Sequence, residues 1–211
     1  MALPKYPTLS SPSFINQMEL KNRMILAPMG SNYADASGKI SEKLKNYLEV
    51  RAKGGVGMII LETSSVSWPL GASMPNMVGL SKDEFIPDLM DLTKRVHKYD
   101  TKIAAQLNQS GKVSQEDISA GRPILVPSIP DKESSDLINI LTLDELNAFV
   151  KSAGPDGKGP KYKELTLEEI NKEINFFVTA AQRVKISGFD AIEIHAGHGY
   201  LISSFLSPSI N

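Results

Sequence analysis

Short apolar runs alternate with helix-like patterns along most of this chain. Four runs, each bounded by proline, glycine or polar residues, predict buried strands at residues 23–27, 57–62, 102–107 and 190–194. Apolar residues spaced three and four apart predict helices between them, over 41–53, from 81 through 96, and from 166 to 188. The third helix carries its apolar positions at Ile170, Ile174, Phe177, Ala181 and Val184.

Three helix starts are predicted from the capping-box pattern, in which Ser or Thr is followed three residues later by Glu. The pairs are Ser81 with Glu84, Thr142 with Glu145, and Thr166 with Glu169. The middle pair lies in a long excursion over residues 108–165, and a connection of this length usually carries function.

The repeated strand–helix order predicts an α/β fold with a parallel sheet and helices outside it. Residues with chemical potential follow the predicted strands directly: Ala27-Pro28-Met29-Gly30, Thr63, Gln106 and the stretch 195–200. Closed barrels and open doubly wound sheets both place active sites at these carboxyl ends, and four strands do not distinguish them. No G-x-G-x-x-G or Walker sequence follows any strand, which disfavours the dinucleotide-binding fold.

The stretch His195-Ala196-Gly197-His198-Gly199-Tyr200 is the strongest candidate site. We expect His195 to point inward from the end of its strand, and the two glycines to let His198 and Tyr200 fold back toward it. The His-x-x-His spacing also fits a metal pair, but a zinc site needs further ligands. We expect Glu193 on the opposite face of the strand, and therefore no metal.

Composition narrows the possible functions. The chain has 23 basic and 24 acidic residues, which gives no electrostatic basis for binding nucleic acid or a membrane surface. It has no cysteine, so disulfides, thiolate nucleophiles and cysteine-held clusters are excluded within these 211 residues. No apolar run approaches the roughly 20 residues of a membrane span. A cytoplasmic protein acting on a small molecule fits these features.

Four segments of the chain, taken in order, resemble the old yellow enzyme family of flavin-dependent ene-reductases. The first segment combines LKNR at 20–23 with APMG at 27–30, and the second is RAKGGVG at 51–57 through LET at 61–63. The third is QL at 106–107 with Gly111. The fourth is GFD at 188–190 through EIH at 193–195, HGYL at 198–201 and FLSP at 205–208. The APMG sequence is most similar to the enoate and 2,4-dienoyl-CoA reductase branch.

This resemblance implies an eight-stranded (β/α)8 TIM barrel, of which residues 1–211 form the N-terminal half of one FMN-binding domain. Only the first four strand units are present, so we expect the natural protein to be longer. A half barrel leaves strand edges unpaired. We therefore expect this segment alone to be poorly soluble, dimeric or partly disordered, which leaves a homo-oligomer open.

The resemblance also implies a reaction: NADH or NADPH reduces FMN, and hydride then passes to an activated C=C bond of an enone, enoate or enoyl compound. His195 and His198 would bind the substrate oxygen, and Tyr200 would donate the proton. Ala27, Pro28, Met29 and Gly30 would lie along the flavin, and Thr63 and Gln106 would contact its ring. FAD or an iron–sulfur cluster would belong only to a C-terminal part beyond residue 211.

Two other functions remain open. Some members of the resembled family oxidatively demethylate amines on the same scaffold. Alternatively, the chain is a truncated half-barrel without catalytic activity. The family's phosphate-binding part is expected outside these residues, so the isolated segment should bind flavin weakly.

Overall fold

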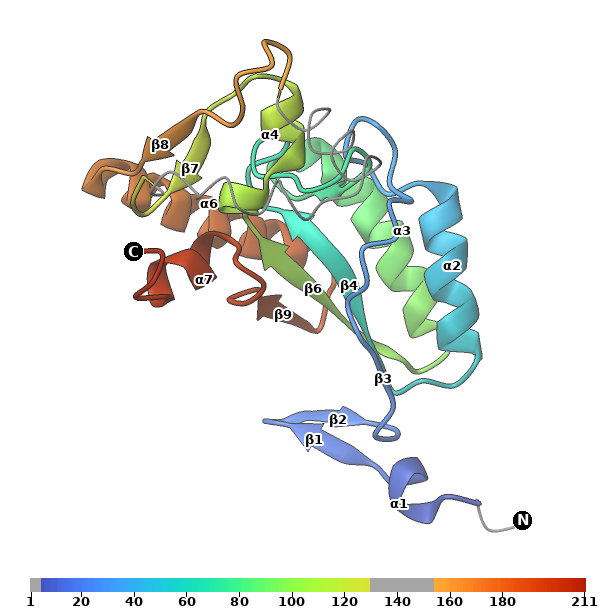
Figure 1. Ribbon diagram of the computed structural model, residues 1–211. Coiled ribbons are helices and arrows are strands. Elements are labelled where there is room, and N and C mark those ends of the chain that lie inside the picture. Colours follow the sequence, from blue (N-terminus) through green and yellow to red (C-terminus); the bar gives the residue numbers. More distant parts are fainter. Residues whose placement is uncertain (1–4, 130–153) are drawn as a thin grey trace, which may run out of the picture.

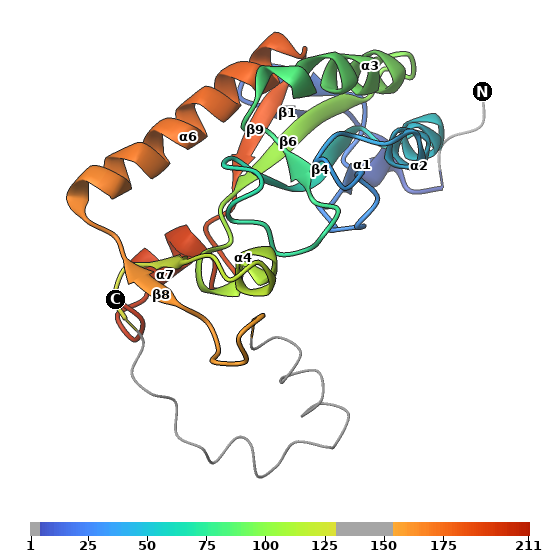
Figure 2. The same ribbon diagram turned by 90° about the horizontal axis from the view of Figure 1, so that it is seen from above.

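The computed structural model describes residues 5–129 and 154–211. Its centre is a parallel sheet in the order β3-β4-β6-β9, formed by Ile25–Leu26, Met58–Ser65, Lys102–Asn108 and Ala191–Ile194 (Figure 1). A two-residue strand, β5 (Val78–Gly79), pairs with the end of β4. Three helices lie along one face of the sheet: α2 (Glu42–Lys53), α3 (Ile86–His97) and α6 (Leu167–Ile186) (Figure 2). The predicted repetition of strand and helix is confirmed.

Local signals account for two of the helix starts. At α2, the Ser41 side chain accepts a hydrogen bond from the backbone N–H of Leu44 at 3.2 Å. At α6, Thr166 and Glu169 form the complete reciprocal capping box, as predicted. The pair Thr142 and Glu145 lies outside the described residues.

The capping box predicted at Ser81 and Glu84 is wrong. A 3-10 turn, η1 (Asp83–Phe85), precedes α3, and neither element has a side-chain cap. The Ser81 hydroxyl instead donates to the backbone carbonyl of Trp68 at 2.9 Å. Because this loop carbonyl engages the hydroxyl, the hydroxyl does not cap the helix.

The main core lies between the sheet and the helices. Alternate residues of β4 and β6 face outward and are almost completely buried, and each such aliphatic side chain contributes about 1.5–3 kcal/mol. This core contains Ile59, Leu61, Ile103, Ala105 and Leu107 from the strands, and Leu44, Leu48, Leu89, Leu92, Ala180 and Val184 from the helices.

The other face of the sheet is apolar at its lower end and polar at its upper end. Met58 and Ala104 pack there against Leu20 of the antiparallel hairpin β1–β2 (Ser13–Ile15 and Met18–Leu20), which follows the short helix α1 (Pro7–Ser10). The hairpin lies beneath the amino ends of the strands (Figure 1). Residues two positions further along each strand therefore face the same side but nearer the carboxyl ends, where Gln106 and Glu193 lie.

The excursion after β6 has its own structure. It forms η2 (Gly111–Val113), α4 (Gln115–Ser119) and a parallel ribbon of β7 (Ile124–Val126) with β8 (Tyr162–Glu164). After β9 the chain forms α7 (Leu201–Leu206). Among the described helices, none combines the length and apolarity needed to cross a membrane.

Within the described residues, β3 and β9 are the edges of the sheet. Apolar side chains on both strands are partly exposed: Ile25 is 45% exposed, Ile192 43% and Ile194 54%, and Ile194 lines an open hollow with side chains of α6 and α7. These open edges agree with the expectation of four strand units from a larger sheet.

Candidate active site

The turn after β9 places three polar rings at the carboxyl end of the sheet. The backbone N–H of His195 donates to the Leu107 carbonyl at 3.0 Å, so His195 continues the β6–β9 ladder. His198 and Gly199 both have left-handed backbone conformations, with φ of 56° and 70°. This reversal brings the chain back to Tyr200, the residue that precedes α7. Gly199 therefore adopts a left-handed backbone conformation that favours glycine, and it allows the turn that the sequence indicated.

The three rings meet, as expected. The His195 Nε2 and His198 Nδ1 atoms are 3.0 Å apart. The Tyr200 ring lies edge-on to His195, with 4.8 Å between ring centroids, and 6.4 Å from the His198 ring. His195 Nδ1 accepts a hydrogen bond from the Gly197 N–H at 3.2 Å, which assigns the proton of a neutral His195 to Nε2. That proton points into the space that His195 shares with His198.

Burial lowers the pKa of His195, and the neighbouring His198 lowers it further, whereas Glu193 opposes the shift. The imidazole of His195 is therefore neutral at neutral pH. A neutral imidazole with one fixed N–H is a hydrogen-bond donor of defined direction.

Glu193 lies on the same face of β9 as His195, and the prediction that it points away is wrong. Residues two apart along a strand share a face, so the period of two itself places Glu193 beside His195. Glu193 is paired directly with Gln106 across β6 and β9, and its Oε1 accepts from Gln106 Nε2 at 2.7 Å. Glu193 is thus a site residue that the sequence analysis missed, although correct use of the alternation reveals it.

Thr63 lies at an irregularity of the sheet. The register between β4 and β6 shifts between Leu61 and Ser64, so Glu62 and Thr63 depart from regular pairing, as often happens beside active sites. The Thr63 hydroxyl is buried and has no hydrogen-bond partner within the described structure. A buried hydroxyl that is otherwise unsatisfied is suited to contact a bound molecule.

Glu62 is a second residue that the sequence analysis missed. It is 4% exposed, and its Oε2 accepts from the Ser31 N–H at 2.9 Å, while its Oε1 has no partner among the described residues. Burial raises its pKa, and the hydrogen bonds from Ser31 oppose that shift. Glu62 therefore ties the segment after β3 to the end of β4. An isolated Glu at a strand end carries no sequence signal for this role.

The segment Ala27-Pro28-Met29-Gly30 directly follows β3, at the same end of the sheet as Thr63 and Gln106. Met29 is 69% exposed. A Cβ atom on Gly30 would lie 2.5 Å from Met74 Cε, so a larger residue there would require Met74 to move. The structure thus brings all the sequence-predicted residues to one end of the sheet.

No group of three or more His, Asp or Glu among the described residues is arranged to hold a metal ion.

The profile of the NADH:flavin oxidoreductase / NADH oxidase family matches residues 8–211. The chain belongs to this family. Among curated relatives, the NADH oxidase of Thermoanaerobacter brockii is 34% identical over 207 residues, which cover 98% of this chain and 28% of that protein. The NADPH dehydrogenase of Clostridium acetobutylicum is 36% identical over 197 residues, covering 93% of this chain and 50% of that protein.

Solved structures of the family agree with the fold. The old yellow enzyme homologue from Zymomonas mobilis aligns with a TM-score of 0.77 and 28% identity over 97% of this chain and 53% of that one. The Old Yellow Enzyme from Pichia sp. AKU4542 aligns with a TM-score of 0.78 at 24% identity, over 97% of this chain and 50% of that one. The parallel sheet and its helices are thus part of a TIM barrel, as expected. The chain spans half or less of the length of most of these relatives.

Proposed function

We propose that this chain supplies the substrate-oxygen site, the proton donor and part of the flavin cradle of an FMN-dependent reductase of activated C=C bonds, driven by NADH or NADPH. The observation that carries the proposal is the convergence of His195, His198 and Tyr200 at the end of the sheet that also holds Gln106. The membership in a family of NADH:flavin oxidoreductases supports it.

The residues at the strand ends fit a flavin ring. The Thr63 hydroxyl is buried and has no partner in the described part of the chain, and Gln106 has an amide oxygen and a second N–H beyond the one that Glu193 accepts. An amide offers both a donor and an acceptor, which matches the alternating groups on the pyrimidine edge of a flavin. Ala27 through Gly30 would line the ring from β3. Bound FMN, once reduced, supplies the hydride that reaches the β-carbon of the alkene.

His195 and His198 would hold the carbonyl oxygen of the substrate. Without substrate, His195 Nε2 and His198 Nδ1 bond to each other at 3.0 Å, so one of them must act as the acceptor. A substrate oxygen placed within reach of both accepts a hydrogen bond from the Nε2–H of His195. It accepts a second hydrogen bond from His198 when that residue carries its proton on Nδ1. Two such donors stabilise the negative charge that develops on the oxygen, and losing one typically costs about 3–4 kcal/mol.

Tyr200 would protonate the α-carbon. A tyrosine phenol keeps its proton at neutral pH and therefore has one to give. The ring packs edge-on against His195, with 4.8 Å between ring centroids, so it lies beside the imidazole proposed to hold the substrate oxygen. The substrate is thus a small molecule bound between these rings and the flavin.

We further propose a cytoplasmic location, which the absence of cysteine supports. The uncovered apolar residues of β9 also support association of this 211-residue chain with itself. Such self-association would bury the exposed apolar residues of β9 against protein rather than leave them in water.

The Tyr200→Phe variant of the complete protein tests the acid role. It should slow reduction of an enone at least tenfold, while reduction of the flavin by NAD(P)H continues at the wild-type rate, because only the second half-reaction needs the proton. Stopped-flow absorbance of the flavin separates the two half-reactions. Equal rates of alkene reduction would remove Tyr200 from this role. A complete protein that stays colourless after flavin is added would contradict the flavin proposal for this chain.

A further inference from the structure

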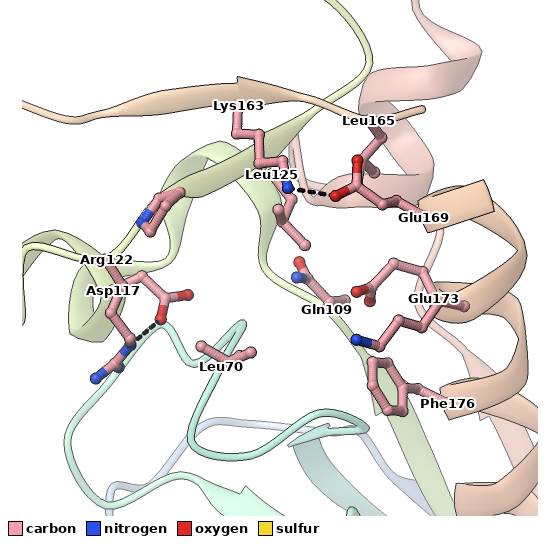
Figure 3. A pocket seen from close by; sticks show the side chains of 12 residues that line it. Leu70, Gln109, Asp117, Arg122, Leu125, Lys163, Leu165, Glu169, Glu173 and Phe176 are labelled. Carbon is pink, nitrogen blue, oxygen red and sulfur yellow. Dashed lines mark hydrogen bonds and ion pairs between the residues drawn. The ribbon is translucent and has the colours of Figure 1, made fainter. Parts of the chain in front are cut away.

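A cavity lies between α6 and the β7–β8 ribbon, apart from the rings of His195, His198 and Tyr200. Its volume is about 260 Å³, and neither histidine of the active site nor Tyr200 lines it (Figure 3). Its lining includes Leu70, Gln109, Leu125, Leu165, Glu173 and Phe176. Five of the twelve lining residues are apolar and six are charged, so the cavity combines hydrocarbon surface with charged groups, a mixed lining that can bind a small molecule.

Glu173 is the polar group that distinguishes this cavity. The residue is 9% exposed, and its Oε2 atom is buried with no hydrogen-bond partner among the described residues. Figure 3 shows its carboxyl group directed into the cavity, toward Gln109. A carboxyl buried among apolar side chains without a partner is costly, and native proteins rarely leave such a group unsatisfied.

Two of the three cations that line the cavity are held in ion pairs with other carboxylates. Arg122 Nε pairs with Asp117 Oδ1 at 2.6 Å, and Lys163 pairs with Glu169. The remaining lysine, Lys172, lies with its Nζ 5.9 Å from the centroid of the Phe176 ring and makes no ion pair with Glu173 within 4.0 Å. The lining therefore holds one buried carboxyl that makes no ion pair among the described residues; the charge of Lys172 acts on it only from a distance beyond 4.0 Å. The missing complement is a group with positive charge and N–H donors.

We propose that this cavity binds a small organic amine, with its ammonium group on Glu173 and its hydrocarbon body against Leu125, Leu165 and Phe176. Ligand pockets for larger molecules measure about 300–1,000 Å³, so this cavity suits a single ring or a short branched chain rather than a coenzyme. The Gln109 amide also lines the cavity, but its oxygen already accepts from the backbone N–H of Gly111 at 2.6 Å, so Glu173 is the acceptor for the ammonium group. This site stands independently of the flavin reaction, because the two sites share no lining residue.

The protonation of Glu173 makes the proposal testable by pH. The pKa of Glu173 is raised to about 7, chiefly by burial; Lys172 opposes the shift, and the negative charges of Asp117 and Glu169 add to it. The other charged groups that line the cavity are Arg122 and Lys163. The carboxylate is the form that pairs with an ammonium group, so affinity should increase as Glu173 ionises. With a pKa near 7, binding should be about tenfold tighter at pH 8 than at pH 6.

Benzylamine is a suitable probe because it remains a cation between these pH values and has one ring. Isothermal titration or ligand-observed NMR with the 211-residue chain should show saturable binding that tightens about tenfold from pH 6 to pH 8. Benzyl alcohol, which has the same ring without the charge, should bind at least tenfold more weakly at pH 8. Equal binding of the two probes would overturn the assignment of the ammonium group to Glu173.

The Glu173→Gln variant should lose both the tight binding and its pH dependence. Glu164→Gln is the matched control, because Glu164 is an exposed carboxyl on β8 beside the same cavity, and it should bind benzylamine as the wild type does. Circular dichroism would establish that both variants are folded. Wild-type affinity in Glu173→Gln, or no saturable binding in the wild-type chain, would overturn the proposal. Neither result bears on flavin binding, which absorbance measures separately.

Discussion

The buried carboxyl of Glu173 should make the stability of this protein depend on pH in a direction opposite to that of most carboxylates. Its pKa is raised from 4.5 to about 7, chiefly because burial disfavours the charged form. The folded state therefore binds this proton more tightly than the unfolded state does. Between pH 4.5 and 7 the ionisation of Glu173 progressively destabilises the fold, and above pH 7 the cost is complete.

The Glu173→Gln variant removes this titration while keeping a side chain of nearly the same size. The difference between 4.5 and about 7 corresponds to about 3 kcal/mol at pH 8, and little of it should be lost to solvent screening because the residue is 9% exposed. We therefore expect the variant to be about as stable as the wild type at pH 4.5 and about 3 kcal/mol more stable at pH 8.

Urea unfolding of both proteins, followed by circular dichroism at several pH values from 4.5 to 8, measures this difference directly. Taking the difference between variant and wild type cancels most of the pH dependence that other groups contribute. The exposed Glu164→Gln control should show no such trend. A stability difference that stays constant with pH, or one in which the wild type gains stability as the pH rises, would refute the reasoning.

Three further outcomes are expected. In His195→Ala, the long-wavelength charge-transfer band that a phenol forms with the flavin-loaded protein should be lost. Because one oxygen-binding donor is removed, kcat/KM should fall by about 100- to 1,000-fold; an unchanged band would contradict that role. Thr166→Ala removes the side chain that caps α6 and should cost about 1 kcal/mol in urea unfolding, whereas Thr179→Ala, in the middle of the same helix, should cost much less. Ile194→Lys places a charge on the uncovered edge strand and should shift the 211-residue chain toward monomer in analytical ultracentrifugation, because Ile194 is 54% exposed; an unchanged distribution of species would place the self-association elsewhere.

The local features of this chain are determined by its sequence. Strands β4, β6 and β9 follow from short apolar runs, α2 lies where the apolar spacing predicts a helix, and α6 begins at the predicted Thr166 cap. These signals act within a few residues, through backbone hydrogen bonds and side-chain periodicity, so no distant contact is needed to read them. The clustering of His195 with its two neighbouring rings is similarly local, since a six-residue turn brings them together.

Contacts between distant segments decided the rest. Ser81 has the pattern of a helix cap, but the Trp68 carbonyl engages its hydroxyl. The pairing of Gln106 with Glu193 joins residues far apart in the chain, and it exists only because β6 and β9 are neighbours in register. Along α6, the helical period favours burial of Ile174, yet this residue is 55% exposed while Glu173 is buried. The period identifies an apolar stripe, but the neighbours available in the folded chain determine which side chains are covered, and here the ribbon β7–β8 covers the carboxyl.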